Sequence, residues 1–157
     1  MDVIIMPSTI SLIKKLRADY PQFSFKKSPS FSWSQSNQTI YYINTDDNCN
    51  LLLHELSHAL LGHTSYSRDI QLITMEREAW DYTIKLALKY DITISDDMVQ
   101  SNLDTYRDWL HKRSTCPKCM ANGLQTAKNT FKCLACGQIW RVNDAKTCAL
   151  RRYSNKT

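Results

Sequence analysis

Two CxxC motifs separated by thirteen residues restrict the fold of this chain more than any other feature of its sequence. They lie in TCPKCMANGLQTAKNTFKCLACGQIWRV, residues 115–142. Each CxxC predicts a tight turn that offers two thiolates, and a hairpin between the turns completes a tetrahedral site. The predicted ligands are Cys116, Cys119, Cys133 and Cys136. We expect a small zinc ribbon whose Zn²⁺ is structural, because four protein ligands leave no open coordination position.

Disulfides are the alternative use of cysteine, and the start of the sequence disfavours them. MDVIIMPSTI lacks the basic segment and long apolar core of a signal peptide, and no apolar run is long enough to span a bilayer. We therefore expect a cytoplasmic protein with reduced thiols and no membrane partner. A redox dithiol would need only one CxxC. Cys49 and Cys148 lie outside both motifs, and we expect them to be small buried apolar groups.

The charges divide the chain into two parts. Residues 1–111 contain 10 Lys/Arg and 14 Asp/Glu, whereas residues 112–157 contain 10 Lys/Arg and a single acid, Asp144. Such asymmetry indicates two modules, of which the basic one has an anionic partner. We expect one domain over residues 1–112 and the basic zinc ribbon with its tail over residues 113–157.

Hydrophobic periodicity predicts an α+β fold for the first part. Phe23/Phe25, Phe31/Trp33 and Ile40/Tyr42 alternate with polar residues and predict a small antiparallel sheet. Gly62 marks a helix end, and Asp69 and Ser95 are candidate N-caps. The predicted helices cover residues 9–20, about 49–62, about 70–90, and from Ser95 to about 112.

The second of these helices contains LLLHELSHALLGH, residues 51–63, with an HExxH motif. Residues four apart share a helix face, so His54 and His58 can reach one Zn²⁺. Glu55 lies about 100° round the helix, where a carboxylate can take a proton from water beside the metal. The surrounding leucines predict a buried helix, and buried imidazoles need a partner such as a metal ion. The pattern is typical of metal-assisted hydrolysis.

A catalytic zinc usually has a third protein ligand, which must come from elsewhere. His63 lies about 180° from His54 if the helix continues, so we expect it at the helix end or outside the ligand set. The next helix carries MEREAWDY, residues 75–82, and we expect Glu78 as the third ligand with Glu76 as the alternative. Asp81 shares the face of Glu78, and we expect it to orient an imidazole from outside the ligand set.

HELSHALLGH followed by MEREAWDY resembles the ImmA/IrrE-type metallopeptidases, whose pattern is close to HELGHALLGH and then E-x-E-A. The resemblance covers about residues 45–90 and implies a zincin-like domain with zinc on His54, His58 and Glu78 and with Glu55 as the catalytic base. It implies an intracellular protease that cuts helix-turn-helix repressors. Ser57 replaces the usual Gly, and IKLALKYDI replaces the family's Leu-Leu-Met-Pro run.

The basic part combines cations with aromatic residues, a composition that suits phosphate pairing and base stacking. Phe131, Trp140 and Tyr153 could instead form the core of the ribbon, with the charges keeping it in solution. We expect binding to nucleic acid or to a protein partner. The candidate residues are Lys128, Lys132, Trp140, Arg141, Arg151 and Arg152, with Lys118 and Lys146 as further cations.

The sequence thus predicts a zinc-dependent endopeptidase with two Zn²⁺, one catalytic and one structural, acting on a protein such as a helix-turn-helix repressor. One alternative resembles SprT-type proteases, in which an HExxH domain also precedes a zinc ribbon and the substrate is protein attached to DNA. That family takes a third histidine as ligand, and only His63 and His111 follow the motif here. The other alternative is a non-catalytic regulator that binds DNA or protein and uses both zinc ions structurally.

Overall fold

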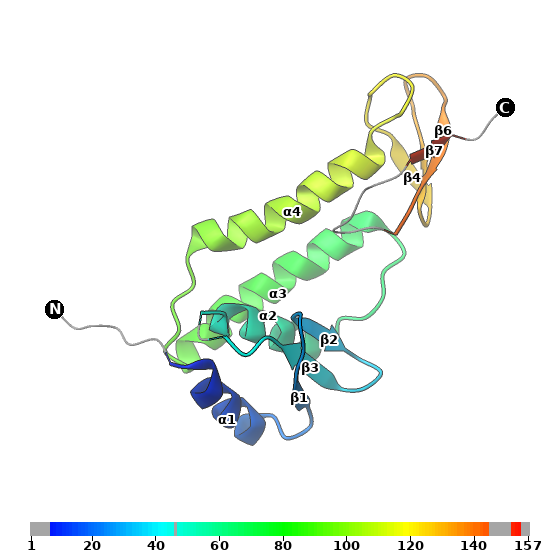
Figure 1. Cartoon of the computed structure of the whole chain (residues 1–157). Coiled ribbons are helices and arrows are strands. Elements are labelled where there is room, and N and C mark those ends of the chain that lie inside the picture. The colour runs from blue at the N-terminus through cyan, green and yellow to red at the C-terminus, as the bar shows by residue number, and fades with distance from the viewer. Residues whose placement is uncertain (1–6, 46, 145–151, 155–157) are drawn as a thin grey trace. The chain divides into compact units, whose positions relative to one another are not determined.

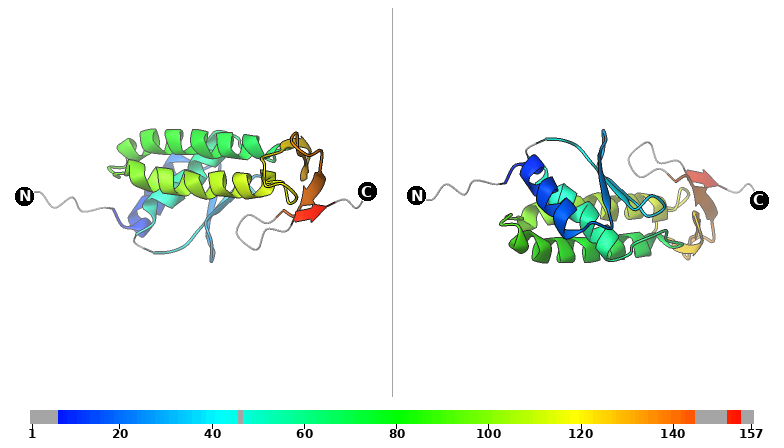
Figure 2. Two further views of the ribbon diagram at one scale, coloured as in Figure 1. Left: turned by 90° about the horizontal axis from the view of Figure 1, so that it is seen from above. Right: turned by 90° about the horizontal axis from the view of Figure 1, so that it is seen from below.

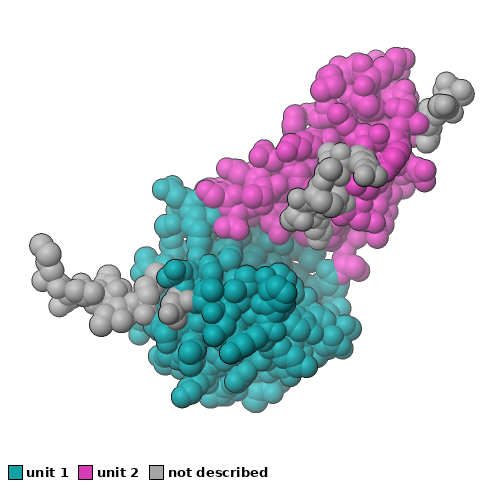
Figure 3. All heavy atoms as spheres, viewed as in Figure 1, with its two compact units in different colours: residues 1–64, 75–99 teal, residues 65–74, 100–157 magenta. Residues whose placement is uncertain are grey.

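The chain forms four helices and two small sheets in the part that the structure describes (Figure 1). A computed structural model describes residues 7–45, 47–144 and 152–154. By compactness the chain divides into unit 1, residues 1–64 and 75–99, and unit 2, residues 65–74 and 100–157 (Figure 3). The α+β class is therefore as predicted, whereas the division differs from the expected boundary after residue 112.

Unit 1 contains a three-stranded sheet of β1 (Ser24–Lys27), β2 (Ser32–Ser34) and β3 (Thr39–Tyr42). The order is β1-β3-β2, with β3 antiparallel to β2 but parallel to β1. The prediction of an antiparallel sheet was wrong for β1, because the chain continues to the far edge before returning to the centre. The predicted alternation holds: Phe25 and Trp33 both pair with the fully buried Ile40.

Helices α1 (Thr9–Asp19) and α2 (Cys49–Leu60) cover this sheet and form one apolar core with it (Figure 2). Ser8 caps α1, since its hydroxyl accepts a hydrogen bond from the Ser11 amide. Leu12, Leu16, Leu52, Leu53 and Leu56 are fully buried. The leucines around HExxH thus hold α2 inside unit 1, as their number predicted.

The end of α2 turns the chain back on itself. Gly62 has φ +67°, and the amide of His63 donates to the carbonyl of His58 at 3.0 Å. This is a Schellman-type C-cap, in which glycine supplies the left-handed backbone at low cost. Its consequence is that His63 leaves the helix direction and returns beside His58.

Two longer helices follow, and each has residues in both units. They are α3 (Asp69–Lys89) and α4 (Asp96–Ser114). Ser95 caps α4 as predicted, because its hydroxyl accepts a hydrogen bond from the Met98 amide at 3.2 Å. Asp69 is not a cap: it is the first residue of α3, and its carboxylate accepts from Arg113. Among the helices of the described residues, none combines the length and apolar character needed to cross a bilayer.

Unit 2 contains a four-stranded antiparallel sheet, with its strands in chain order. They are β4 (Leu124–Ala127), β5 (Thr130–Lys132), β6 (Ile139–Val142) and β7 (Arg152–Ser154). Phe131 and Trp140 stack at 5.6 Å in its core. A Cβ at Gly123 would collide with the Trp140 ring and with the Lys132 carbonyl, so this position requires glycine.

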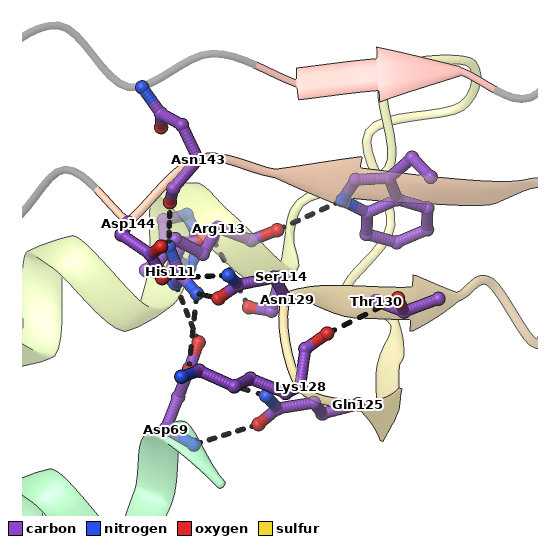
Figure 4. A network of polar contacts seen from close by, with 11 residues as sticks. Asp69, His111, Arg113, Ser114, Gln125, Lys128, Asn129, Thr130, Asn143 and Asp144 are labelled. Atoms are coloured by element: carbon purple, nitrogen blue, oxygen red, sulfur yellow. Dashed lines mark hydrogen bonds and ion pairs between the residues drawn. The ribbon is translucent and has the colours of Figure 1, made fainter. Parts of the chain in front are cut away.

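A buried polar network explains why the start of α3 and the end of α4 belong to the compact unit of the ribbon (Figure 4). The guanidinium of Arg113 donates to Asp69 at 2.6 Å and to the side chain of Asn129 at 2.6 Å. The Asp69 amide donates to the side chain of Gln125 at 2.8 Å. Both side chains of the Arg113–Asp69 pair are almost fully buried, so the network fixes the ribbon to these helix ends.

Candidate metal centres

In unit 1 two helices bring three possible metal ligands together, and we call this group the His–Glu site. His54 and His58 come from α2 and Glu76 from α3. Nε2 of His54 lies 3.0 Å from Oε2 of Glu76 and 3.1 Å from Nε2 of His58. Nε2 of His58 lies 3.4 Å from Oε1 of Glu76. All three residues are buried.

These distances fit one tetrahedral ion. Ligand atoms at 2.0–2.1 Å from zinc are separated by about 3.3 Å, close to the three spacings of the His–Glu site. Two imidazoles and a carboxylate are also a donor set that zinc takes in hydrolytic enzymes. Burial lowers the pKa of His54, although the hydrogen bond with Glu76 opposes this, and a neutral imidazole is the form that binds a metal.

The carboxylate of Glu76 is held ionised. Burial raises its pKa, but hydrogen bonds from His54 and His58 outweigh burial and bring the pKa to about 2. An ionised Glu76 between His54 and His58 allows all three side chains to bind the same cation.

Glu76, and not Glu78, therefore stands as the candidate third ligand. Glu78 lies two residues further, about 200° round α3, and its side chain is 53% exposed. The rotation of α3 about its axis determines which of the two glutamates faces α2. A stripe of buried residues along α3 fixes this rotation. Ala79, Trp80 and Thr83 follow Glu76 at helical spacings of three, four and seven, and all are buried. This stripe is visible in the sequence and was the signal that would have selected Glu76.

Residues of the same stripe contact the HExxH helix. Trp80 stacks on His54 with ring centroids 4.1 Å apart. The hydroxyl of Thr83 lies 2.8 Å from that of Ser57, and both residues are fully buried. Ser57, the departure from the glycine of the resembled pattern, thus has a polar partner on α3, and the pair fixes how α2 and α3 pack.

His63 stands outside the His–Glu site but contacts it through His58. Their Nδ1 atoms lie 2.8 Å apart, and Nε2 of His63 lies 3.4 Å from Oε2 of Glu78. When both imidazoles are neutral and Glu78 is ionised, only one pair of tautomers satisfies both hydrogen bonds. His63 donates from Nε2 to Glu78, and His58 donates from Nδ1 to His63. In this tautomer Nε2 of His58 would offer its lone pair to a metal ion in place of the hydrogen bond that it donates to Glu76 when no ion is bound.

Asp81 does not take the orienting role that we expected. It is exposed on α3, five residues from Glu76 and hence on another face of the helix. Nδ1 of His58 has His63 as its partner, and Nδ1 of His54 has no hydrogen-bond partner among the described residues. The carboxylate that acts on an imidazole from outside the ligand set is that of Glu78.

Glu55, the expected base, follows His54 on α2 and is half-buried. Burial raises its pKa to about 7, with the charge of His58 and a backbone hydrogen bond from Trp33 acting in the opposite direction. A carboxyl group whose pKa lies near neutrality can both accept and return a proton.

Unit 2 holds a second group, which we call the cysteine site. Sγ of Cys116 lies 3.7 Å from that of Cys136, and Sγ of Cys119 lies 3.5 Å from that of Cys133. All four sulfurs lie within 4.8 Å of one another. Thiolates at 2.3 Å from zinc in a tetrahedron are about 3.8 Å apart, so the four cysteines fit one ion.

The two CxxC turns have the same backbone hydrogen bonds. Cys116 and Cys133 each accept at the carbonyl from the amide four residues later, that of Met120 or of Gly137. These amide-bearing residues both have positive φ, +64° for Met120 and +76° for Gly137. Burial raises the pKa of Cys116, but hydrogen bonds from amides of its own turn outweigh burial and lower the pKa, which favours the thiolate that zinc requires.

The candidate binding residues of the ribbon separate into two groups. Trp140 is fully buried and Phe131 is 1% exposed, so both aromatics form the core and Trp140 is not an interface residue. Lys128, Lys132, Arg141 and Arg152 are exposed, and Arg152 donates to the carbonyl of Thr115 at 2.9 Å. Arg151, Lys146 and Cys148 lie outside the described residues. Cys49 is buried, as expected.

Comparisons with protein-family models, with curated proteins and with solved structures found no match to this chain. The geometry of the two metal centres therefore carries the functional interpretation.

Proposed function

We propose that this protein is a zinc-dependent endopeptidase whose reaction takes place at the His–Glu site. The observation that carries the proposal is the convergence of His54, His58 and Glu76 in a buried position with zinc-like spacings. Glu55 directly follows one of the ligands and has a pKa near 7. The HExxH pattern supports the proposal, because it combines two histidines that can bind one metal ion with a carboxylate on the same helix turn.

His54, His58 and Glu76 would hold the zinc ion, and Glu55 would move the proton. When bound, zinc supplies Lewis acidity that polarises a peptide carbonyl and makes water more acidic. Glu55 accepts the proton that the attacking water loses and then delivers it to the nitrogen of the leaving amine. The tautomer set by His63 and Glu78 would leave Nε2 of His58 unprotonated and able to hold the ion.

The number of ligands supports an enzyme over a regulator with a structural zinc. Among the described residues the His–Glu site has three donors, whereas structural zinc sites are closed by four. Three donors leave a position for water or substrate. A third histidine, which the SprT-type alternative requires, is not part of the group in the described residues.

For the substrate we propose a protein such as a helix-turn-helix repressor, on the resemblance to ImmA/IrrE-type peptidases alone. Since the run after the Glu-containing helix differs from that family's, contacts to the substrate are expected to be specific to this chain.

The test compares wild-type protein with Glu55→Gln, which keeps the size of the side chain and all three ligands but removes the base. Both would be expressed in cells lacking the chain, and new protein N-termini would be identified by mass spectrometry. We expect a small set of new N-termini with the wild type that is absent with the variant, while both proteins contain two zinc ions. Identical sets of N-termini would leave a non-catalytic regulator as the better description.

A further inference from the structure

The sheet of the zinc ribbon has one face in its core and one face in solvent. Phe131 and Trp140 are direct partners across β5 and β6 and are buried. Because side chains alternate along a strand, the neighbours of these two residues point the other way. We call that outer surface the ribbon face. It consists of Leu124, Thr130, Lys132, Ile139, Arg141 and Tyr153.

Apolar and cationic side chains adjoin on the ribbon face. Lys132 pairs with Leu124 on one side and with Ile139 on the other. Arg141 pairs with Tyr153. Leu124 is 57% exposed, Ile139 40% and Tyr153 48%. Single exposed apolar residues are normal, but three on one side of a small sheet indicate a surface that contacts a partner.

The charge of the ribbon face has no counter-charge within it. The face contains no carboxylate, and the only acid of residues 113–157 is Asp144, which accepts a hydrogen bond from Asn129 beyond the end of β6. Lys132 and Arg141 are both exposed. A surface of this kind complements a polyanion that also presents flat apolar groups.

We propose that the ribbon face binds single-stranded nucleic acid. Lys132 and Arg141 contact phosphates, and the Tyr153 ring stacks on a base next to Arg141. A single strand is the form that fits, since its bases can leave the stack and meet an aromatic ring and aliphatic side chains, whereas duplex bases present only their edges. This binding does not depend on the proposed peptidase activity.

Fluorescence anisotropy with the zinc-loaded full chain tests the proposal. The probes are labelled oligodeoxythymidylate, a labelled single-stranded RNA of mixed sequence, and a DNA duplex of the same length. We expect a single-stranded probe to bind more tightly than the duplex. Lys132→Gln and Arg141→Gln should each reduce the slope of log K against log salt by about 0.7. Tyr153→Leu should weaken binding about tenfold, and Tyr153→Phe should retain it.

Lys112→Gln is the matched control, because Lys112 is an exposed lysine of unit 2 on α4 and its loss changes the net charge equally. It should leave both affinity and salt slope close to wild type. Lys132→Arg, which keeps the charge, should bind normally and so separates loss of charge from loss of folding. Absence of binding to either single strand, tighter binding to the duplex, or equal effects of Lys112→Gln and Lys132→Gln would overturn the proposal.

Discussion

Nδ1 of His58 lies 2.8 Å from Nδ1 of His63, at the point where Gly62 turns the chain back along α2. The imidazole of His58, a candidate metal ligand, thereby receives a hydrogen-bond partner from its own helix end, and Glu78 contacts the other ring nitrogen of His63. His63 thus lies at the helix end and outside the candidate ligand set, where its angular position on an ideal helix had placed it. Its contact with Nδ1 of His58 suits it to orient that candidate ligand.

Replacing His63 should therefore weaken zinc binding at the His–Glu site. We expect His63→Ala to lower the affinity of that site for zinc about 10- to 100-fold, the usual effect of removing a partner that orients a metal-binding histidine. Competition with a chromophoric chelator measures it. His111→Ala is the control, because His111 is exposed on α4. Equal affinities of wild type and His63→Ala would show that the contact does not orient His58.

Counting the zinc ions bound per chain distinguishes Glu76 from Glu78 as the third ligand. Glu76→Gln should reduce bound zinc from two ions per chain to one, since it removes the carboxylate that lies 3.0 Å from Nε2 of His54. Glu78→Gln, the same chemical change on the same helix, should retain two ions, with weaker binding at the His–Glu site. Elemental analysis of the purified variants decides. One ion in Glu78→Gln and two in Glu76→Gln would restore the ligand expected from the sequence.

Features formed by residues close together in the sequence could be predicted from it, whereas features that join distant segments could not. CxxC and HExxH place their ligands within one turn of chain, so both motifs could be assigned from spacing alone. Glu76 comes from another helix, and its selection depends on how α3 rotates against α2. That rotation follows from the buried positions Ala79, Trp80 and Thr83, which lie on the same face of α3 as Glu76.

Other features could not be derived from spacing. The parallel pairing of β1 with β3 depends on the order in which strands enter the sheet, which short alternating segments leave open. The pair of Arg113 and Asp69 joins residues 44 positions apart, and neither belongs to a motif. Such contacts are set by tertiary packing, and they determine where the chain divides into compact units.

The raised pKa of Glu55 predicts a pH dependence of stability in protein whose His–Glu site has been emptied. A mild chelator should remove that zinc first, because four thiolates hold zinc more firmly than two imidazoles and a carboxylate. The folded pKa of about 7 exceeds the ordinary value of 4.5, so the contribution of Glu55 to stability is complete below about pH 4.5 and is lost as pH rises through 7. Its slope is at most about 1.4 kcal/mol per pH unit.

Glu55→Gln removes this titration. The difference in unfolding free energy between the variant and the wild type, both in the one-zinc form, should therefore move in favour of the variant from pH 5 to pH 8. Urea unfolding at several pH values measures it. A difference that does not change with pH would contradict the raised pKa.

The two CxxC turns of the cysteine site have the same backbone conformation. We therefore expect the introduction of glycine in one turn and its removal from the other to change stability in opposite directions. Met120 adopts φ +64° and is 65% exposed, so Met120→Gly should stabilise unit 2 by roughly 0.5–1 kcal/mol through relief of a left-handed backbone. Gly137→Ala should destabilise it by about 1 kcal/mol, although a Cβ there would meet no atom within 4 Å. Thermal unfolding of the zinc-loaded variants tests both, and equal signs for the two would contradict the equivalence.

Loss of the buried ion pair of Arg113 and Asp69 should lower the stability of unit 2 more than loss of an exposed ion pair on the same helix. Their side chains are 2% and 3% exposed, and Arg113 also donates to Asn129. Arg113→Met would leave the Asp69 carboxylate buried without its cation, at a cost of about 3–5 kcal/mol. The cost should appear in urea unfolding of the zinc-loaded chain followed by tryptophan fluorescence.

Arg107→Met is the matched control for this loss. Arg107 forms an ion pair with Asp104 on the same helix, but the two side chains are 48% and 63% exposed. Exposed pairs contribute at most about 1 kcal/mol, because solvent screens the charges and the side chains lose entropy in pairing. Arg113→Met should therefore lower the urea midpoint several times more than Arg107→Met. Comparable midpoints would mean that Asp69 finds another cation or water once Arg113 is removed, and that burial of the pair does not determine the stability of unit 2.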